Sequence, residues 1–165
     1  MRELSFGLTR RQLAPPSSDR NTPPASLVRP QGRSGGGIAG VRLTASASSP
    51  APEVTFFGGV ELSDDDVVVT VSGASDALPG TEAGNVKVTA LSEYPAKGRG
   101  TGGVRCHRFL RNEDTLLTAY VGPAPALAAS AAGTPVDLPT ELGRRDGSGT
   151  PAAQPIAAIA GRLRT

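Results

Sequence analysis

The chain has 165 residues, the length of about one domain. It contains 21 glycines, 15 prolines and no tryptophan, a composition that excludes a large, tightly packed enzyme core. The formal net charge is only +2, but of the 17 basic residues only Lys87 and Lys97 are lysine. The basic groups are therefore mostly guanidinium groups, which donate paired hydrogen bonds to phosphate.

Cys106 is the single cysteine, which excludes an internal disulfide and a four-cysteine zinc site. No run of apolar residues reaches the ~20 that a membrane-spanning helix needs, and the first residues do not have the pattern of a signal peptide. We expect a cytoplasmic protein.

In chain order, residues 1–25 mix Arg, Pro and Ser without a regular period, so we expect a disordered or non-native leader. Residues 26–139 alternate short runs of branched apolar residues with turn residues, a pattern typical of antiparallel strands. The predicted strands are residues 40–43, 53–57, 67–71, 85–89, 104–110 and 115–121.

The alanine-rich residues 124–132 are broken by prolines, so a short strand or turn is as favourable there as a helix. Residues 140–165 return to the composition of a linker and predict a flexible tail. Within this tail, residues 156–160 could form one helical turn.

A sequence repeat carries most of the functional information. Residues 31–38 (QGRSGGGI) align with residues 97–104 (KGRGTGGV), and an apolar strand with an arginine follows each segment. Such self-similarity indicates repeated supersecondary units. Glycine lets a backbone approach phosphate closely, and the neighbouring Arg or Lys supplies charge, so each segment suits nucleic acid. Exposed turns without a ligand are the alternative interpretation.

Residues 91–104 (LSEYPAKGRGTGGV) resemble the blade signature of the C-terminal domain of bacterial type IIA topoisomerase A subunits, in DNA gyrase and topoisomerase IV. Residues 28–33 (VRPQGR) are similar to the same signature one blade earlier. The resemblance implies an all-β fold, a partial β-pinwheel of four-stranded, propeller-like blades with disordered N-terminal and C-terminal tails. Two blades are expected within residues 26–139, as a fragment of the family domain.

By this resemblance the function is to bind, bend and wrap duplex DNA without sequence preference, in support of an ATP-dependent parent topoisomerase. The implied partners are duplex DNA, an ATPase B subunit and the remainder of an A subunit, with a nucleoid-associated location. The implied DNA-binding residues are Arg29, Arg33, Arg42, Lys97, Arg99, Arg105 and Arg108. The alternative is a structural remnant of a truncated gene that does not bind DNA stably. Gyrase and topoisomerase IV both remain open as the parent type.

No cofactor, metal or catalytic residue is expected, and the chain is predicted to be inactive alone because it lacks the catalytic tyrosine domain. Adjacent Cys106 and His107 should point to opposite faces of a strand, with His107 at the surface or near DNA. Residues 63–66 (SDDD) suit a solvated turn better than a metal site. Tyr94 and Tyr120 suit the core or rim. Two glycine-rich matches to a dinucleotide motif, residues 35–40 and 98–103, lack the helix that such a site needs.

Overall fold

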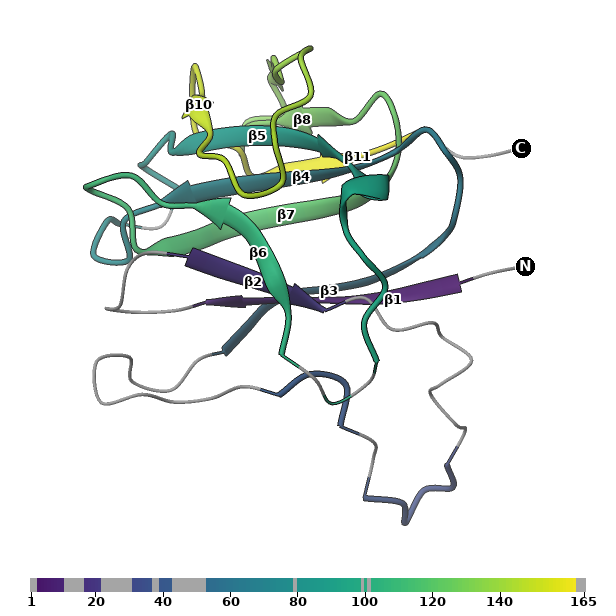
Figure 1. Ribbon diagram of the computed structural model, residues 1–165. Helices are drawn as coiled ribbons and strands as arrows, with labels where there is room; N and C mark the ends of the chain where they lie inside the picture. Colours follow the sequence, from purple (N-terminus) through teal and green to yellow (C-terminus); the bar gives the residue numbers. More distant parts are fainter. Residues whose placement is uncertain are drawn as a thin grey trace.

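The computed structural model describes residues 3–10, 17–21, 31–36, 39–42, 53–78, 80–98, 100 and 102–162. These residues form an all-β structure in which a single short 3-10 turn, η2 (Leu91–Glu93), interrupts the strands. The strands form two four-stranded sheets and one three-stranded sheet. Figure 1 shows the sheets as layers, with β1, β2 and β3 on one side of β4 and β7, and β8 and β11 on the other.

The first sheet has the order β3-β1-β2-β6. Its strands are β1 (Glu3–Arg10), β2 (Ser17–Asn21), β3 (Glu53–Glu61) and β6 (Val104–Arg108), and every neighbouring pair is antiparallel. Residues 1–25, expected to be a disordered leader, therefore supply two strands. The two strands pair with each other, and their other partners, β3 and β6, lie far along the chain, so the local sequence gives no sign of this second pairing.

The second sheet has the order β10-β5-β4-β7 and lies in the centre of the molecule. It consists of β4 (Asp66–Gly73), β5 (Asn85–Ala90), β7 (Thr115–Pro123) and β10 (Thr150–Pro151). Every residue of β4 is buried. A run of valines suits this strand, because both of its faces are covered by other sheets.

The third sheet has the order β11-β8-β9 and consists of β8 (Leu127–Ala129), β9 (Pro135–Val136) and β11 (Ala158–Ala160). The structure departs here from the expected flexible tail, because β10 and β11 pair with β5 and β8. It also replaces the helical turn considered for residues 156–160 by the strand β11. These strands have two or three residues each, too few for a period to be recognised.

Alternate residues of β4 face two separate hydrophobic clusters. Val68 packs with Cys106, Leu116 and other residues between the first and second sheets. Val67, Val69 and Val71 pack on the opposite side, toward the third sheet. The period of two therefore places successive valines of one strand in two cores.

The strands predicted at residues 53–57, 67–71, 85–89, 104–110 and 115–121 are confirmed as β3 to β7. Of the strand predicted at residues 40–43, the described residues 40–42 form only a bridge at Val41, and residue 43 lies outside the described residues. Tyr94 is buried in the core, as expected. Among the described residues, no helix is long and apolar enough to span a membrane.

Candidate nucleic-acid interface

Five of the seven predicted DNA-binding residues lie among the described residues, and all five side chains are exposed: Arg33, Arg42, Lys97, Arg105 and Arg108. Arg29 and Arg99 lie outside the described residues. Arg105 and Arg108 stand on β6, at the edge of the first sheet. Arg33 lies in a turn that the Gly35 amide closes by donating to the Gly32 carbonyl at 2.9 Å.

The second Gly-Arg segment contacts the chain just after the first. The Gly100 amide donates a hydrogen bond of 2.9 Å to the carbonyl of Gly40, two residues after the first segment ends. Gly100 has a φ of +71°, a conformation that side chains with a Cβ rarely adopt. Glycine at this position thus allows the repeat to form a contact between segments distant in sequence.

The loop of residues 143–149 lies beside β6 and adds Arg144 and Arg145 to its basic residues. The Arg145 guanidinium donates to the Arg105 carbonyl at 2.7 Å, and the Arg108 amide donates to the Gly147 carbonyl at 3.0 Å. The Arg145 amide also donates to the Glu93 carboxylate at 2.8 Å. The expectation that residues 140–165 form a flexible tail is corrected for Arg144 and Arg145 by these contacts.

Lys87, on β5, holds the 143–149 loop in place. Its buried ammonium group donates to the carbonyls of Arg144, Arg145 and Gly147 at 3.1, 2.7 and 2.8 Å. Burial lowers the pKa of Lys87 to about 8, against the raising effect of Cys106, Asp146 and Glu93. The ammonium group therefore remains mostly protonated at pH 7, and all three of its protons have an acceptor.

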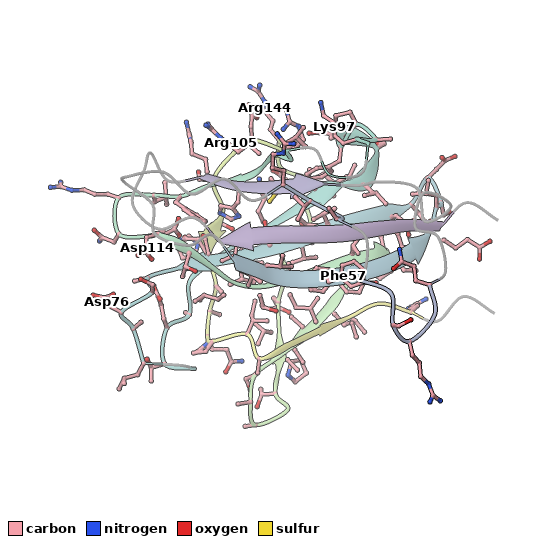
Figure 2. All side chains as sticks on the ribbon, turned by 90° about the horizontal axis from the view of Figure 1, so that it is seen from below. Phe57, Asp76, Lys97, Arg105, Asp114 and Arg144 are labelled. Carbon is pink, nitrogen blue, oxygen red and sulfur yellow. The ribbon has the colours of Figure 1, made fainter. Side chains whose placement is uncertain are left out.

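Figure 2 shows Lys97, Arg105 and Arg144 along the same edge of the molecule, with Asp76, Asp114 and Phe57 elsewhere. We call these three residues the basic edge. The Arg144 side chain is 88% exposed, and its Nε lies 3.8 Å from an Asp146 carboxylate oxygen. The three residues come from the loop between η2 and β6, from β6 itself and from the 143–149 loop. Exposed cations arranged in this way can contact successive phosphates of a duplex, but they cannot by themselves distinguish bases.

His107 is fully buried rather than at the surface or near DNA, which corrects the prediction for this residue. Its Nδ1 lies 2.8 Å from the Thr70 hydroxyl, and its Nε2 lies 3.0 Å from the Ser72 hydroxyl. Burial, with a smaller contribution from the nearby Lys87 charge, lowers the pKa of His107 to about 3. The imidazole is therefore neutral.

The His107 ring also holds the 143–149 loop, because the Gly149 amide donates to its Nε2 at 3.2 Å. An amide can only donate, so Nε2 accepts and Nδ1 carries the ring proton that Thr70 accepts. Ser72 donates its single proton to Glu113 at 2.8 Å, and Asn85 donates to the same carboxylate oxygen, so no proton lies between Ser72 and Nε2. The buried polar cluster of serine, histidine and glutamate is enclosed, and the hydrogen bond from Gly149 to His107 attaches the loop to the sheet.

The other residues considered for metal binding or catalysis are Cys106 and residues 63–66. Cys106 is fully buried in the core. The predicted solvated turn occurs at Asp64 and Asp65, whereas Asp66 is buried at the start of β4 and accepts the Ser63 amide at 2.8 Å. Within the described ranges, no three His, Cys, Asp or Glu side chains are grouped closely enough to hold a metal ion.

Sequence reasoning missed Lys87, Arg144 and Arg145 as parts of the site. The sequence contained one signal for Lys87. It lies between Val86 and Val88 in a predicted strand, so its side chain is expected on the opposite face of that strand from the two valines. The consecutive arginines carried no comparable signal, because their place beside β6 depends on contacts distant in sequence.

Comparisons with known proteins agree with this architecture. A family model described as the DNA gyrase C-terminal domain, a β-propeller, matches residues 24–47 and 80–121, which include both Gly-Arg segments. The crystal structure of the C-terminal domain of a DNA topoisomerase IV superposes with a TM-score of 0.67. That match covers 97% of this chain and 46% of the solved chain, at 16% sequence identity.

Two curated relatives are similar over part of the chain. The topoisomerase subunit TopoM of Mycolicibacterium smegmatis is 36% identical over 98 residues, which are 59% of this chain and 12% of the relative. The DNA gyrase A subunit of Aeromonas salmonicida is 41% identical over 80 residues, which are 47% of this chain and 7% of the relative. The chain thus spans a small part of the length of these relatives.

The stacked four-stranded sheets and the superposition define the class of the protein: it is an all-β domain of the propeller or pinwheel type. Within this class, residues 24–47 and 80–121 are similar to the DNA gyrase C-terminal domain, and parts of the chain are similar to a topoisomerase subunit and to a DNA gyrase A subunit.

Proposed function

We propose that this chain binds duplex DNA through phosphate contacts of the basic edge, and that it bends or wraps the duplex for a parent topoisomerase. The observation that carries the proposal is the gathering of Lys97, Arg105 and Arg144 on one edge from three separate segments. Arg33, Arg42 and Arg108 supply further exposed charge, and the predicted Arg29 and Arg99 would add to it.

The geometry favours contact with phosphates over reading of bases. None of the three residues of the basic edge lies on a helix that could enter a major groove, since they lie on a strand or in loops. The 143–149 loop is fixed by Lys87 and His107, so Arg144 contacts a phosphate without the entropy cost of ordering a free loop. Such a surface binds any duplex sequence and releases counterions on binding.

In the parent enzyme, the partners that this function requires are an ATPase B subunit and the remainder of an A subunit, in a complex associated with the nucleoid. The described residues of this chain offer no assembled nucleophile, base and open site, and Tyr94 is buried. The contribution of the chain is accordingly to hold DNA, with strand cleavage carried out by the parent enzyme.

Fluorescence anisotropy with a labelled duplex, titrated at several salt concentrations, tests the proposal. We expect log affinity to fall linearly with log salt, and by the same amount for two duplexes of unrelated sequence. No binding at low salt, or binding without salt dependence, would contradict it.

Circular dichroism with a thermal melt on the same sample separates this function from a structural remnant. A cooperative β-sheet transition accompanies a working module, whereas a remnant gives a featureless melt and no binding. A folded protein that fails to bind would contradict the DNA function alone.

A further inference from the structure

The chain leaves β6 through a turn that is fixed at both ends, before it returns as β7 (Figure 1). The Glu113 amide donates to the Leu110 carbonyl at 3.0 Å, and the Leu110 amide donates to Oε2 of Glu113 at 2.6 Å. Oε1 of this buried carboxylate accepts hydrogen bonds from Ser72 on β4 and from Asn85 at the start of β5. Residues 110–113 are therefore tied to the central sheet, and the turn has little freedom to change its shape.

This turn presents one large apolar side chain to solvent between basic groups. Leu110 is 42% exposed, and Arg108, Arg111 and Asn112 are exposed beside it. Several large apolar side chains are exposed elsewhere among the described residues, but only Leu110 has an arginine within two positions on each side. We call residues 108–113 the Leu110 turn.

The acidic residues of this segment do not oppose the basic ones. Glu113 is buried, and its carboxylate accepts the hydrogen bonds described above. Both carboxylate oxygens of Asp114 accept from Ser75, one from its amide at 2.7 Å and one from its hydroxyl at 2.6 Å. The charge that the Leu110 turn presents outward is therefore the positive charge of Arg108 and Arg111, which suits phosphate.

The Leu110 turn continues the line of charges that begins at the basic edge. Arg105 and Arg108 both stand on β6, three residues or about 10 Å apart along the strand. The Arg108 amide donates to the Gly147 carbonyl at 3.0 Å, so the 143–149 loop with its own arginines lies beside the start of the turn. A duplex that follows β6 along the basic edge thus reaches the Leu110 turn.

We propose that Leu110 is a wedge that enters the minor groove of the bound duplex and partly unstacks one base step, so that the duplex kinks there. This inference rests on the proposed DNA function and adds the means of bending. Proteins that kink DNA insert an apolar side chain between base pairs and place Arg or Asn along the minor groove, which is about 6 Å wide. The rigidity of the turn matters because a turn that yields would move aside instead of separating stacked bases.

Two duplexes of equal length and charge test the wedge with the whole chain. One is fully paired, and the other has a single mismatched base pair at its centre, which lowers the cost of unstacking. By anisotropy we expect the wild type to bind the mismatched duplex about five- to tenfold more tightly, with the same slope of log affinity against log salt for both. Leu110→Ala should bind the two duplexes equally. Leu117→Ala is the matched control, because Leu117 is 39% exposed on β7 and has no neighbouring arginine, so this variant should keep the preference.

A 2-aminopurine base next to the mismatch reports the unstacking directly. Its fluorescence should rise when the wild type or Leu117→Ala binds and stay unchanged with Leu110→Ala, whose affinity for the paired duplex shows that the variant is folded. Equal binding of both duplexes by the wild type, or a preference that Leu110→Ala retains, would overturn the wedge and leave salt-dependent DNA binding intact. If the wild type binds neither duplex, the proposed DNA function and the wedge are both wrong.

Discussion

Cys106 and His107 are neighbours in sequence and both are fully buried, yet they serve different purposes. Cys106 packs among apolar residues between the first and second sheets. His107 contacts the polar residues Thr70 and Ser72 on β4 and the Gly149 amide of the 143–149 loop. A histidine buried in this way is held in its neutral form by burial and hydrogen bonds, so the stability of the folded state decreases when acid favours the protonated form.

The lowered pKa of His107 predicts a loss of stability at mildly acidic pH. Because its pKa falls from 6.5 to about 3 on folding, the unfolded chain binds a proton between these values and the folded chain does not. Stability from this group is complete above pH 6.5 and is lost as pH decreases toward 3. From pH 6.5 to 5 we expect a loss of about 1.5 kcal/mol in the free energy of unfolding.

Urea denaturation at pH 6.5 and pH 5 measures this loss, in a range where ordinary carboxylates stay ionised. His107→Gln keeps hydrogen-bonding groups but cannot be protonated, so the variant should lose most of the dependence on pH. Equal dependence in the two proteins would show that another group is responsible.

Lys87→Met tests the role of the buried ammonium group. The substitution keeps an apolar chain of similar length but removes the donor to the carbonyls of Arg144, Arg145 and Gly147. We expect a net destabilisation of about 1–2 kcal/mol, since the lost hydrogen bonds are partly offset by no longer burying a charge. Amide exchange of Gly147 and Gly149 should increase by about tenfold as the loop opens more often. Lys97→Met changes an exposed lysine and should leave this exchange unchanged.

At the scale of elements, the contact between β10 and β5 depends on the absence of a side chain at Gly149. A Cβ placed there would lie 2.9 Å from the Asn85 carbonyl carbon and 3.0 Å from the Val86 amide nitrogen. These are backbone atoms of a central sheet and cannot move aside cheaply. Gly149→Ala should therefore separate β10 from β5 and destabilise the protein by about 1–3 kcal/mol.

A thermal melt measures that destabilisation, and Gly102→Ala provides the control because nothing lies within 4 Å of a Cβ at Gly102. If Gly149→Ala melts at the wild-type temperature, the close approach of residue 149 to β5 does not exist in solution.

A strand could be predicted from the sequence when its own residues determine it, and not when it depends on partners distant in sequence. The valine run at residues 67–71 identifies β4 by itself, because a strand buried on both faces is apolar throughout. Residues 3–10 and 17–21 pair with each other and also with β3 and β6, which lie more than thirty positions away. The two-residue strand β10 likewise exists because β5 provides its partner. No local pattern contains that information.

At the scale of the molecule, the Gly-Arg repeat was sufficient to indicate the resemblance to the DNA gyrase C-terminal domain, whose family model matches residues 24–47 and 80–121. The repeat was not sufficient to define the basic edge. Arg105 was recognised because it follows the repeat in a predicted strand, whereas Arg144 reaches the same edge through a loop held by Lys87. The packing of the sheets brings Arg105 and Arg144 to one edge, and the spacing of the two residues in the sequence does not reveal that they are close.

The last prediction concerns the charges on this edge. Arg105→Ala and Arg144→Ala should each remove about one phosphate contact, lower affinity equally for unrelated duplexes and reduce the slope of log affinity against log salt by about one. The Arg144 side chain is mostly exposed, and its carbonyl still accepts from Lys87 in the variant, so the loop keeps its place. Arg162→Ala removes the same charge from an exposed position two residues after β11, a strand of the third sheet, and should leave the slope unchanged. If Arg162→Ala reduces this salt dependence and the other two variants do not, the DNA-binding surface lies near the end of β11 rather than at the basic edge.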